Sequence, residues 1–196
     1  MRGYAFSFDD SYYEDGQRGM AELQRDLAEA RALAEQYEEL AALARNAEVA
    51  RTSTDAYAEA SVEMAHLVNE IQEVRAANDQ AAATVVQEIT AVIEGWTGQF
   101  EDEIASGASQ AALRERLFKI NRINDVLGTV NEARVATFRA QLFNDPEGLR
   151  DSIAGLNRVP GIMAELRAIT RQAANLAQLA LVEENVAAYR EAVEVI

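Results

Sequence analysis

Three arginines and three tyrosines are the residues of this chain whose chemistry best suits recognition of a small molecule. The arginines stand near two predicted breaks in helical structure, and the tyrosines lie on apolar stripes with a polar hydroxyl at the tip. They are Arg2, Arg134, Arg139, Tyr4, Tyr57 and Tyr189. A buried carboxylate needs paired guanidinium groups and further hydrogen-bond donors. The set therefore predicts a site for a carboxylate-type ligand, although each arginine by itself also fits an ordinary surface ion pair.

Other polar clusters favour neither a metal site nor catalysis. Glu63 stands three residues before His66, as in the metal pairs of helical bundles, but His66 is the only histidine and cannot complete such a site. The run Glu101-Asp102-Glu103 lacks the alternating spacing of a calcium loop and fits a solvated helix end. No Gly-rich phosphate loop, nucleophile elbow or opposed acid-base pair is present. We therefore expect no metal, no cofactor and no enzymatic activity.

Composition limits the fold class and the partners. The 196 residues are 49% hydrophobic and include only 2 Pro and 10 Gly, which favours an all-helical chain with a buried core. A formal net charge of -15 repels phosphate backbones and anionic lipid headgroups, so we expect no nucleic-acid partner. The sequence holds neither a signal peptide nor an apolar run of about eighteen residues. Any membrane contact is thus expected only through helices outside this chain.

The helices that position the candidate residues can be placed from capping residues and apolar spacing. A first helix ends near residue 8, where Asp9, Asp10 and Ser11 favour a turn or a new cap, and a second begins between residues 13 and 16. No Gly or Pro marks the next turn, which we expect between residues 36 and 53. Each of these segments carries one apolar stripe, as expected for helices that pack on one side.

A long helix is expected from about residue 55 to residue 104, because apolar residues recur on it every seven positions. We call this pattern the heptad seam; its first row is Met64, Ile71, Asn78, Val85 and Val92, and its second row is Leu67, Val74 and Ala81. Such a helix would be roughly 75 Å long at 1.5 Å per residue, which suits two stacked bundles better than one. Asn78 would either fix the register of the seam or be partly solvated.

The second half of the chain repeats the order of the first. A turn at residues 106–109, with Ser109 as a cap, is followed by a helix to Phe143 and a break at residues 144–148, where Pro146 suits the first turn of the next helix. That helix should be kinked or interrupted at Pro160-Gly161. A poorly marked turn near residues 173–181 then leads into the last helix.

An internal repeat supports a doubled unit. Ala56–Ala60 and Ala188–Ala192 share the pattern Ala-Tyr-x-Glu-Ala, and Gly16-Gln17-Arg18 is matched by Gly148-Leu149-Arg150 at the same offset. Two such units predict two stacked four-helix bundles that share long helices. Because neither copy is complete, we expect the chain to be a segment of a longer protein, with truncated termini.

Three features of the sequence resemble the helical bimodular sensor domain of bacterial chemoreceptors (methyl-accepting chemotaxis proteins) and sensor kinases. They are Arg2-Gly3-Tyr4 leading into Asp9-Asp10, the segment Glu132-Ala133-Arg134 through Phe138-Arg139 leading into Asn144-Asp145, and the paired Ala-Tyr-x-Glu-Ala segments. The resemblance implies a periplasmic homodimer that binds small metabolites, organic acids among them, inside its bundles and signals by helix displacement. Of the family's membrane-proximal pocket arginines, only Arg2 can be placed here.

With that resemblance we divide residues 1–196 into two parts of one sensor domain. The membrane-distal bundle is expected to contain residues 13–75 and 148–196, and the membrane-proximal part residues 1–12 and 76–147. The alternative function is a helical scaffold or coiled-coil module without a small-molecule ligand, whose acidic faces would bind a protein with a basic surface.

Overall fold

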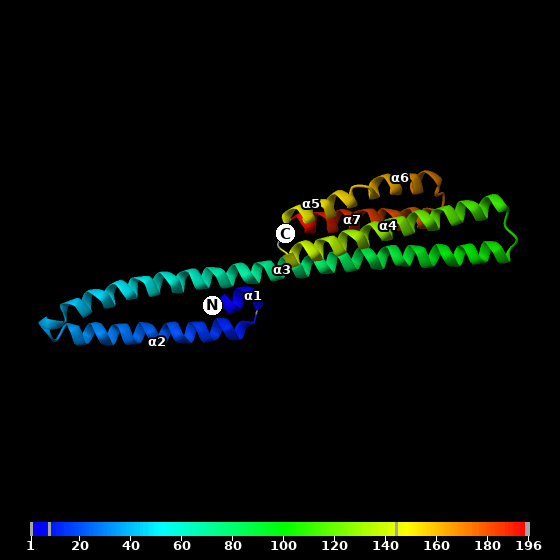
Figure 1. Cartoon of the computed structure of the whole chain (residues 1–196). Helices are drawn as coiled ribbons and strands as arrows, with labels where there is room; N and C mark the ends of the chain where they lie inside the picture. The colour runs from blue at the N-terminus through cyan, green and yellow to red at the C-terminus, as the bar shows by residue number, and fades with distance from the viewer. Residues whose placement is uncertain (1, 8, 144, 195–196) are drawn as a thin grey trace. The chain divides into compact units, whose positions relative to one another are not determined.

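A computed structural model describes residues 2–7, 9–143 and 145–194, and these residues are almost entirely helical (Figure 1). The elements in chain order are α1 (Arg2–Ser7), α2 (Asp10–Ala34), the short 3₁₀ helix η1 (Glu38–Leu40), α3 (Ala41–Ala105), α4 (Gln110–Phe143), α5 (Pro146–Leu156), α6 (Val159–Ile169) and α7 (Ala173–Glu194). No strand occurs in the described residues. The predicted all-helical fold class is confirmed.

Most predicted helix ends are confirmed, because local hydrogen bonds determine them. The Asp9 carboxylate accepts a hydrogen bond from the Ser11 backbone N–H at 3.0 Å and caps α2. Gly107 has φ +72°, a conformation that suits glycine, and the Ser109 hydroxyl accepts from the Ala112 backbone N–H at 3.2 Å. These helices begin where short polar side chains can accept hydrogen bonds from the free backbone N–H groups of the first turn.

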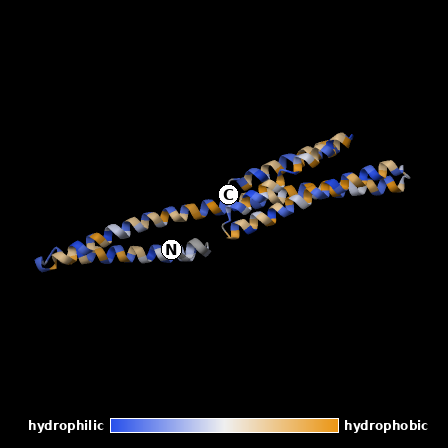
Figure 2. Cartoon of the chain, turned by 45° about the horizontal axis from the view of Figure 1, so that its top comes forward, coloured by the Kyte–Doolittle hydropathy of each residue, from blue (hydrophilic) through white to orange (hydrophobic). Residues whose placement is uncertain are grey.

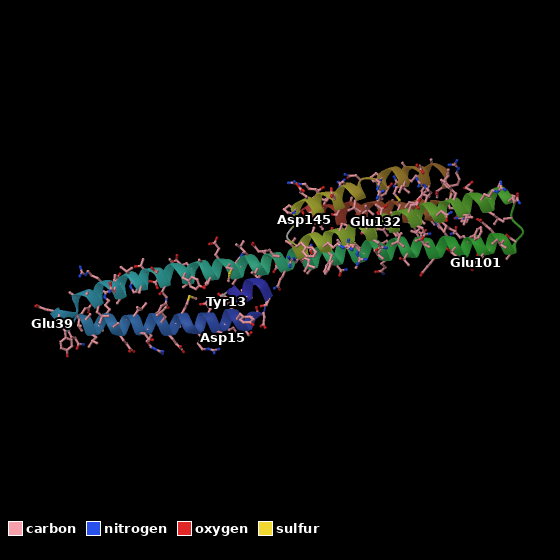
Figure 3. The ribbon with its side chains drawn as sticks, in the orientation of Figure 1. Tyr13, Asp15, Glu39, Glu101, Glu132 and Asp145 are labelled. Carbon is pink, nitrogen blue, oxygen red and sulfur yellow. The ribbon has the colours of Figure 1, made fainter. Side chains whose placement is uncertain are left out.

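The break before α5 follows the same rule. The Asp145 carboxylate accepts hydrogen bonds from the backbone N–H groups of Glu147 and Gly148, both at 3.1 Å, and Pro146 lies in the first turn. Asp145 is labelled at this helix start in Figure 3. Asn144, the first residue of the predicted break, lies outside the described residues.

The starts of α2 and α3 and the position of the last turn differ from the sequence prediction. Helix α2 begins at Asp10, ahead of the expected residues 13–16, because Asp9 caps it. The long helix α3 begins at Ala41, well before the expected residue 55, since its alanine-rich start favours helix without a capping signal. The last turn was expected near residues 173–181, and this is wrong: the turn lies between α6 and α7 at Thr170. Thr170 is extended there (φ -88°, ψ 130°), and its hydroxyl donates to the Leu166 carbonyl at 2.7 Å.

The chain divides into two compact units, residues 1–73 and residues 74–196, and α3 contributes to both. We call them unit 1 and unit 2. This grouping differs from the expected one, which placed residues 148–196 with residues 13–75. Short connections between α4, α5, α6 and α7 explain the difference, since consecutive helices joined by a few residues pack against each other. The predicted stacking of two four-helix bundles stays a prediction.

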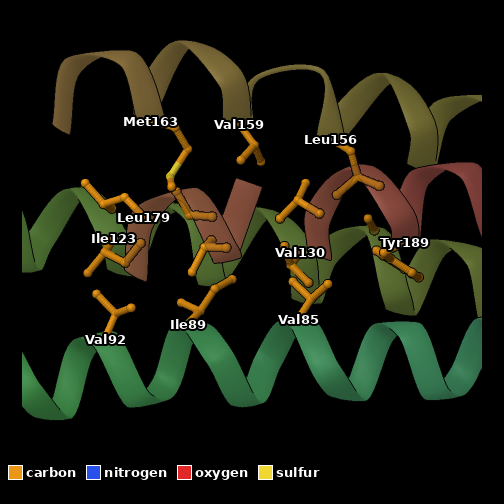
Figure 4. Close-up of a cluster of buried hydrophobic side chains, with 14 of the residues drawn as sticks. Val85, Ile89, Val92, Ile123, Val130, Leu156, Val159, Met163, Leu179 and Tyr189 are labelled. Carbon is orange, nitrogen blue, oxygen red and sulfur yellow. The ribbon is translucent and has the colours of Figure 1, made fainter. Parts of the chain in front are cut away.

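Unit 2 is a helical bundle with one continuous apolar core. The second part of α3, α4, α7 and the pair α5–α6 each turn apolar residues inward (Figure 4). The labelled core residues are Val85, Ile89, Val92, Ile123, Val130, Leu156, Val159, Met163, Leu179 and Tyr189. The break between α5 and α6 lies at Asn157 and Arg158, just before Pro160, as the sequence predicts. Val159 and Met163 of α6 therefore still reach the core that Leu156 of α5 enters.

Unit 1 contains α1, α2, η1 and the first part of α3. Helix α2 pairs with α3 through mostly small or medium-sized buried residues, which are Met20, Ala34, Ala47, Ala65 and Val68. Polar contacts join the same two helices, such as Gln24 Nε2 to Asp55 Oδ1 at 3.0 Å and Arg31 to Glu48 at 3.1 Å. Apolar and polar residues alternate along both helices in Figure 2. Among the described residues, unit 1 thus has two long helices rather than four.

None of the described helices combines the length and the apolar character that crossing a bilayer requires.

Candidate functional site

Unit 2 has a cavity of about 690 Å³ beside the C-terminal part of α4. Its lining comes from three helices: residues 78–82 of α3, residues 131–143 of α4 and Tyr189 of α7. Three of the six predicted site residues, Arg134, Arg139 and Tyr189, lie in this lining. The structure therefore brings together half of the set that sequence chemistry selected.

The spacing of residues along α4 places both charged and apolar side chains beside the cavity. Ala133, Thr137 and Ala140 recur every three or four residues and are buried in unit 2. Arg134 and Phe138, one position further along the chain, fall on the neighbouring face, where both are exposed and border the cavity. Helix α4 thus offers charged and apolar side chains to the same space.

Three buried polar atoms in the lining make no hydrogen bond within the described part of the chain. They are Asn78 Oδ1, Gln141 Nε2 and the Tyr189 hydroxyl oxygen. Asn78 is 3% exposed and Tyr189 is 0% exposed. An unsatisfied buried polar group costs about 1–3 kcal/mol, so a rearrangement that lets a ligand or water reach these atoms would gain a hydrogen bond.

The charges around the cavity are unbalanced in favour of an anion. Arg134 and Arg139 stand against one carboxylate of the lining, Asp79. Arg134 Nη1 donates to Asn131 Oδ1 at 3.4 Å, and neither arginine forms an ion pair with the residues that the structure describes. Two guanidinium groups without carboxylate partners can therefore turn to an incoming anion at little cost.

The Tyr189 side chain is held by its neighbours in the core of unit 2. Burial raises the pKa of the Tyr189 phenol above its ordinary value of 10.0, and this outweighs the lowering effects of the Thr137 hydroxyl and of the Arg134 charge. The Thr137 hydroxyl itself donates to Ser152 Oγ at 3.1 Å. Tyr189 therefore stays protonated near neutral pH, with its hydroxyl beside that of Thr137.

The raised pKa predicts a change of stability with pH. Tyrosines of the unfolded chain ionise near pH 10, at a lower pH than Tyr189 does in the folded chain. The contribution of Tyr189 to the free energy of unfolding of unit 2 should therefore be constant below about pH 10 and decrease above it. In Tyr189→Phe this fall should be smaller. Urea unfolding at about pH 8 to about pH 11, followed by the fluorescence of Trp96, the single and buried tryptophan of unit 2, measures it.

Tyr57→Phe is the control for this prediction. Tyr57 lies in unit 1, so its replacement should leave the transition that Trp96 reports unchanged. Equal losses of stability with rising pH in wild type and Tyr189→Phe would contradict the assignment.

The other predicted site residues lie in unit 1. Tyr4 is 2% exposed and packs on Tyr13, with ring centroids 5.4 Å apart, while its hydroxyl donates to Asn69 Oδ1 at 3.4 Å. Burial raises the pKa of the Tyr4 phenol. Tyr57 is 53% exposed on α3, and the side chain of Arg2 lies outside the described part of the structure. Neither Tyr4 nor Tyr57 is part of the lining of the cavity in unit 2.

Sequence reasoning missed Gln141 and Asp79 as site residues, and it expected Asn78 either to fix the register of the seam or to be partly solvated. The position of Asn78 on the heptad seam was the available signal, since a buried amide needs a partner. Gln141 gave none, because a glutamine on a long amphipathic helix usually faces solvent.

In the described ranges, no group of three or more His, Asp or Glu side chains could hold a metal ion.

Comparison with known proteins identifies no relative from which a function could be inferred. No protein-family model, no curated protein and no solved structure matches this chain.

Proposed function

We propose that this chain is the ligand-binding domain of a sensor and that the cavity of unit 2 takes a small organic carboxylate. In the full receptor the domain would be periplasmic and dimeric, as in chemoreceptors of the helical bimodular type, and anchored through helices outside this chain. One observation carries the proposal: among the residues that the structure describes, two arginines without carboxylate partners and three residues with an unsatisfied buried polar atom border a single cavity.

The arrangement defines the chemical features of the ligand. Its carboxylate would pair with the guanidinium groups of Arg134 and Arg139. The Tyr189 hydroxyl can donate a hydrogen bond, and Asn78 Oδ1 can only accept one, so a second polar group with an O–H or N–H fits best. The apolar side chains of Phe138 and Leu142 border the same space and suit a short carbon skeleton.

The lining also suggests how occupancy would be signalled. The ligand would contact α3, α4 and α7 together, and each of these is a long helix. Binding would favour the arrangement in which all three helices reach the ligand at once, so their relative positions would shift between the empty and occupied states. Stiff helices transmit such a shift along their length.

Isothermal titration calorimetry on the full chain tests the proposal. The panel contains carboxylates of two to six carbons, with and without a hydroxyl group, and the matching amines. Carboxylates should give saturable heat and a hydroxy acid should bind more tightly than its unsubstituted counterpart, whereas the amines should give none. Absence of heat from every carboxylate would overturn small-molecule sensing at this site.

A further inference from the structure

The heptad seam of α3 is buried in unit 2 but open in unit 1. In unit 2 its residues Asn78, Val85 and Val92 are at most 3% exposed. In unit 1, Leu67 and Ile71 of the same seam are 52% and 46% exposed, and Tyr57, one heptad before Met64, is 53% exposed. A pattern that is covered by helices along one part of α3 thus continues without a cover along the other part.

Helix α2 offers a second apolar row on the same face of unit 1. On α3 the buried residues Ala47, Thr54, Ser61 and Val68 recur every seven positions, and the open residues Tyr57 and Ile71 follow Thr54 and Val68 by three positions. On α2, Leu23 follows the buried Met20 by the same three positions and is 46% exposed. Because the two helices are antiparallel neighbours (Figure 1), equal offsets place both rows on one side of the pair.

We call this surface the open face; its residues are Leu23, Tyr57, Leu67 and Ile71. Met64, between them on the seam, is partly buried against Tyr4, Ala65 and Val68. Between Tyr57 and Ile71 it extends over about two heptads, or roughly 21 Å at 1.5 Å per residue. Ala30, one heptad after Leu23, is small enough to let another helix approach closely. The spacing fits the apolar side of one further helix laid along this side of α2 and α3.

The charge beside the open face selects the kind of helix. From residue 52 to residue 74 the chain has no Lys or Arg, and its carboxylates are Asp55, Glu59, Glu63, Glu70 and Glu73. Glu63 and Glu70 each directly precede a residue of the first seam row, the flanking position that sets partner choice in coiled coils. Glu59, Val62, Glu63, His66 and Leu67 line a shallow groove of about 540 Å³ along this flank.

We propose that the open face of unit 1 docks a basic amphipathic helix of a partner protein. Apolar side chains of that helix would cover Leu67 and Ile71, and its Lys or Arg side chains would lie against Glu63 and Glu70. A second copy of this chain fits less well, because the same glutamates would then face each other with like charge. The surface is separate from the cavity, and its role does not depend on the proposed ligand.

Two labelled peptides of three heptads test the proposal against the full chain by fluorescence anisotropy. Both have Leu at the core positions; one has Lys and the other Glu at the flanking positions. The Lys peptide should bind at least about ten times more tightly than the Glu peptide and weaken as salt increases. Equal binding of both peptides, or no binding of the Lys peptide, would overturn the assignment.

Paired variants show whether the peptide uses the open face. Leu67→Glu with Ile71→Glu should weaken Lys-peptide binding at least about tenfold, since both side chains are exposed and the fold does not need them. Ile104→Glu with Leu117→Glu adds the same charge at exposed positions of unit 2 and should change the affinity for the Lys peptide far less. Glu63→Lys with Glu70→Lys should reverse the preference toward the Glu peptide; an unchanged preference would count against the charge argument.

Sedimentation separates a partner helix from a second copy. The chain should remain monomeric through this surface, with the same sedimentation for wild type and Leu67→Glu with Ile71→Glu. A dimer that this pair of substitutions dissociates would assign the open face to self-association and overturn the proposal.

Discussion

Replacing Arg134 and Arg139 together with glutamine should weaken binding of the best carboxylate at least about 100-fold. Glutamine keeps a polar side chain but removes the charge, and a hydrogen bond to a charged group contributes about 1.5–3 kcal/mol. Loss of two such contacts exceeds the roughly 2.8 kcal/mol that a hundredfold change in the dissociation constant requires. Both arginines are exposed on α4, so the fold should be unaffected. Calorimetry with the carboxylate that gives the tightest binding measures the effect.

The matched control is Arg114→Gln with Arg150→Gln. These arginines also belong to unit 2 and are exposed, but neither borders the cavity. The control removes the same net charge and should change the affinity by less than about threefold, since exposed charges at a distance are screened by salt. A similar loss in both double variants would mean that the carboxylate responds to overall charge, and unchanged affinity in Arg134→Gln with Arg139→Gln would exclude this cavity as the site.

Leu179→Ala should reduce the free energy of unfolding of unit 2 by about 3 kcal/mol. Leu179 is 0% exposed in the middle of the core, and removal of a buried leucine side chain loses its transfer free energy and leaves a cavity. Leu181→Ala, two residues further along α7, should cost less than about 1 kcal/mol because Leu181 is 42% exposed. Urea unfolding followed by Trp96 fluorescence compares the two variants.

Equal effects of the two substitutions would contradict the packing of α7 described here. The comparison is informative because the residue type, the helix and the size of the truncation are the same. Only the side of α7 differs, so a difference in stability reports which side faces α3 and α4.

The fold was predictable from sequence wherever a local interaction decides it. Asp145 and Pro146 signal a helix start by themselves, because the cap and the fixed proline φ act within one turn. The last turn was misplaced because it depends on Thr170, a residue that is equally at home within a helix. The grouping of residues 148–196 with residues 74–147 also went unpredicted, since the apolar stripe of a helix does not say which neighbour covers it.

The candidate site was only half predictable for the same reason. Arg134 and Arg139 could be selected by chemistry and by their place near a break, and they do border one cavity. Tyr57 and Tyr189 occupy matching places in the sequence repeat, yet one is half-exposed and the other fully buried. A repeat in sequence fixes the order of elements, whereas burial depends on how many helices surround each copy.

The unsatisfied atoms of Asn78, Gln141 and Tyr189 have a consequence for how such a chain evolves. A protein selected only for durability would replace them with leucine or phenylalanine of similar size and gain melting temperature. A sensor gains from keeping them, because a molecule that satisfies these groups raises the melting temperature, and the rise grows with the logarithm of its concentration above the dissociation constant. The empty state is then less stable to heat than the occupied state, so the melting temperature reports whether the cavity is occupied.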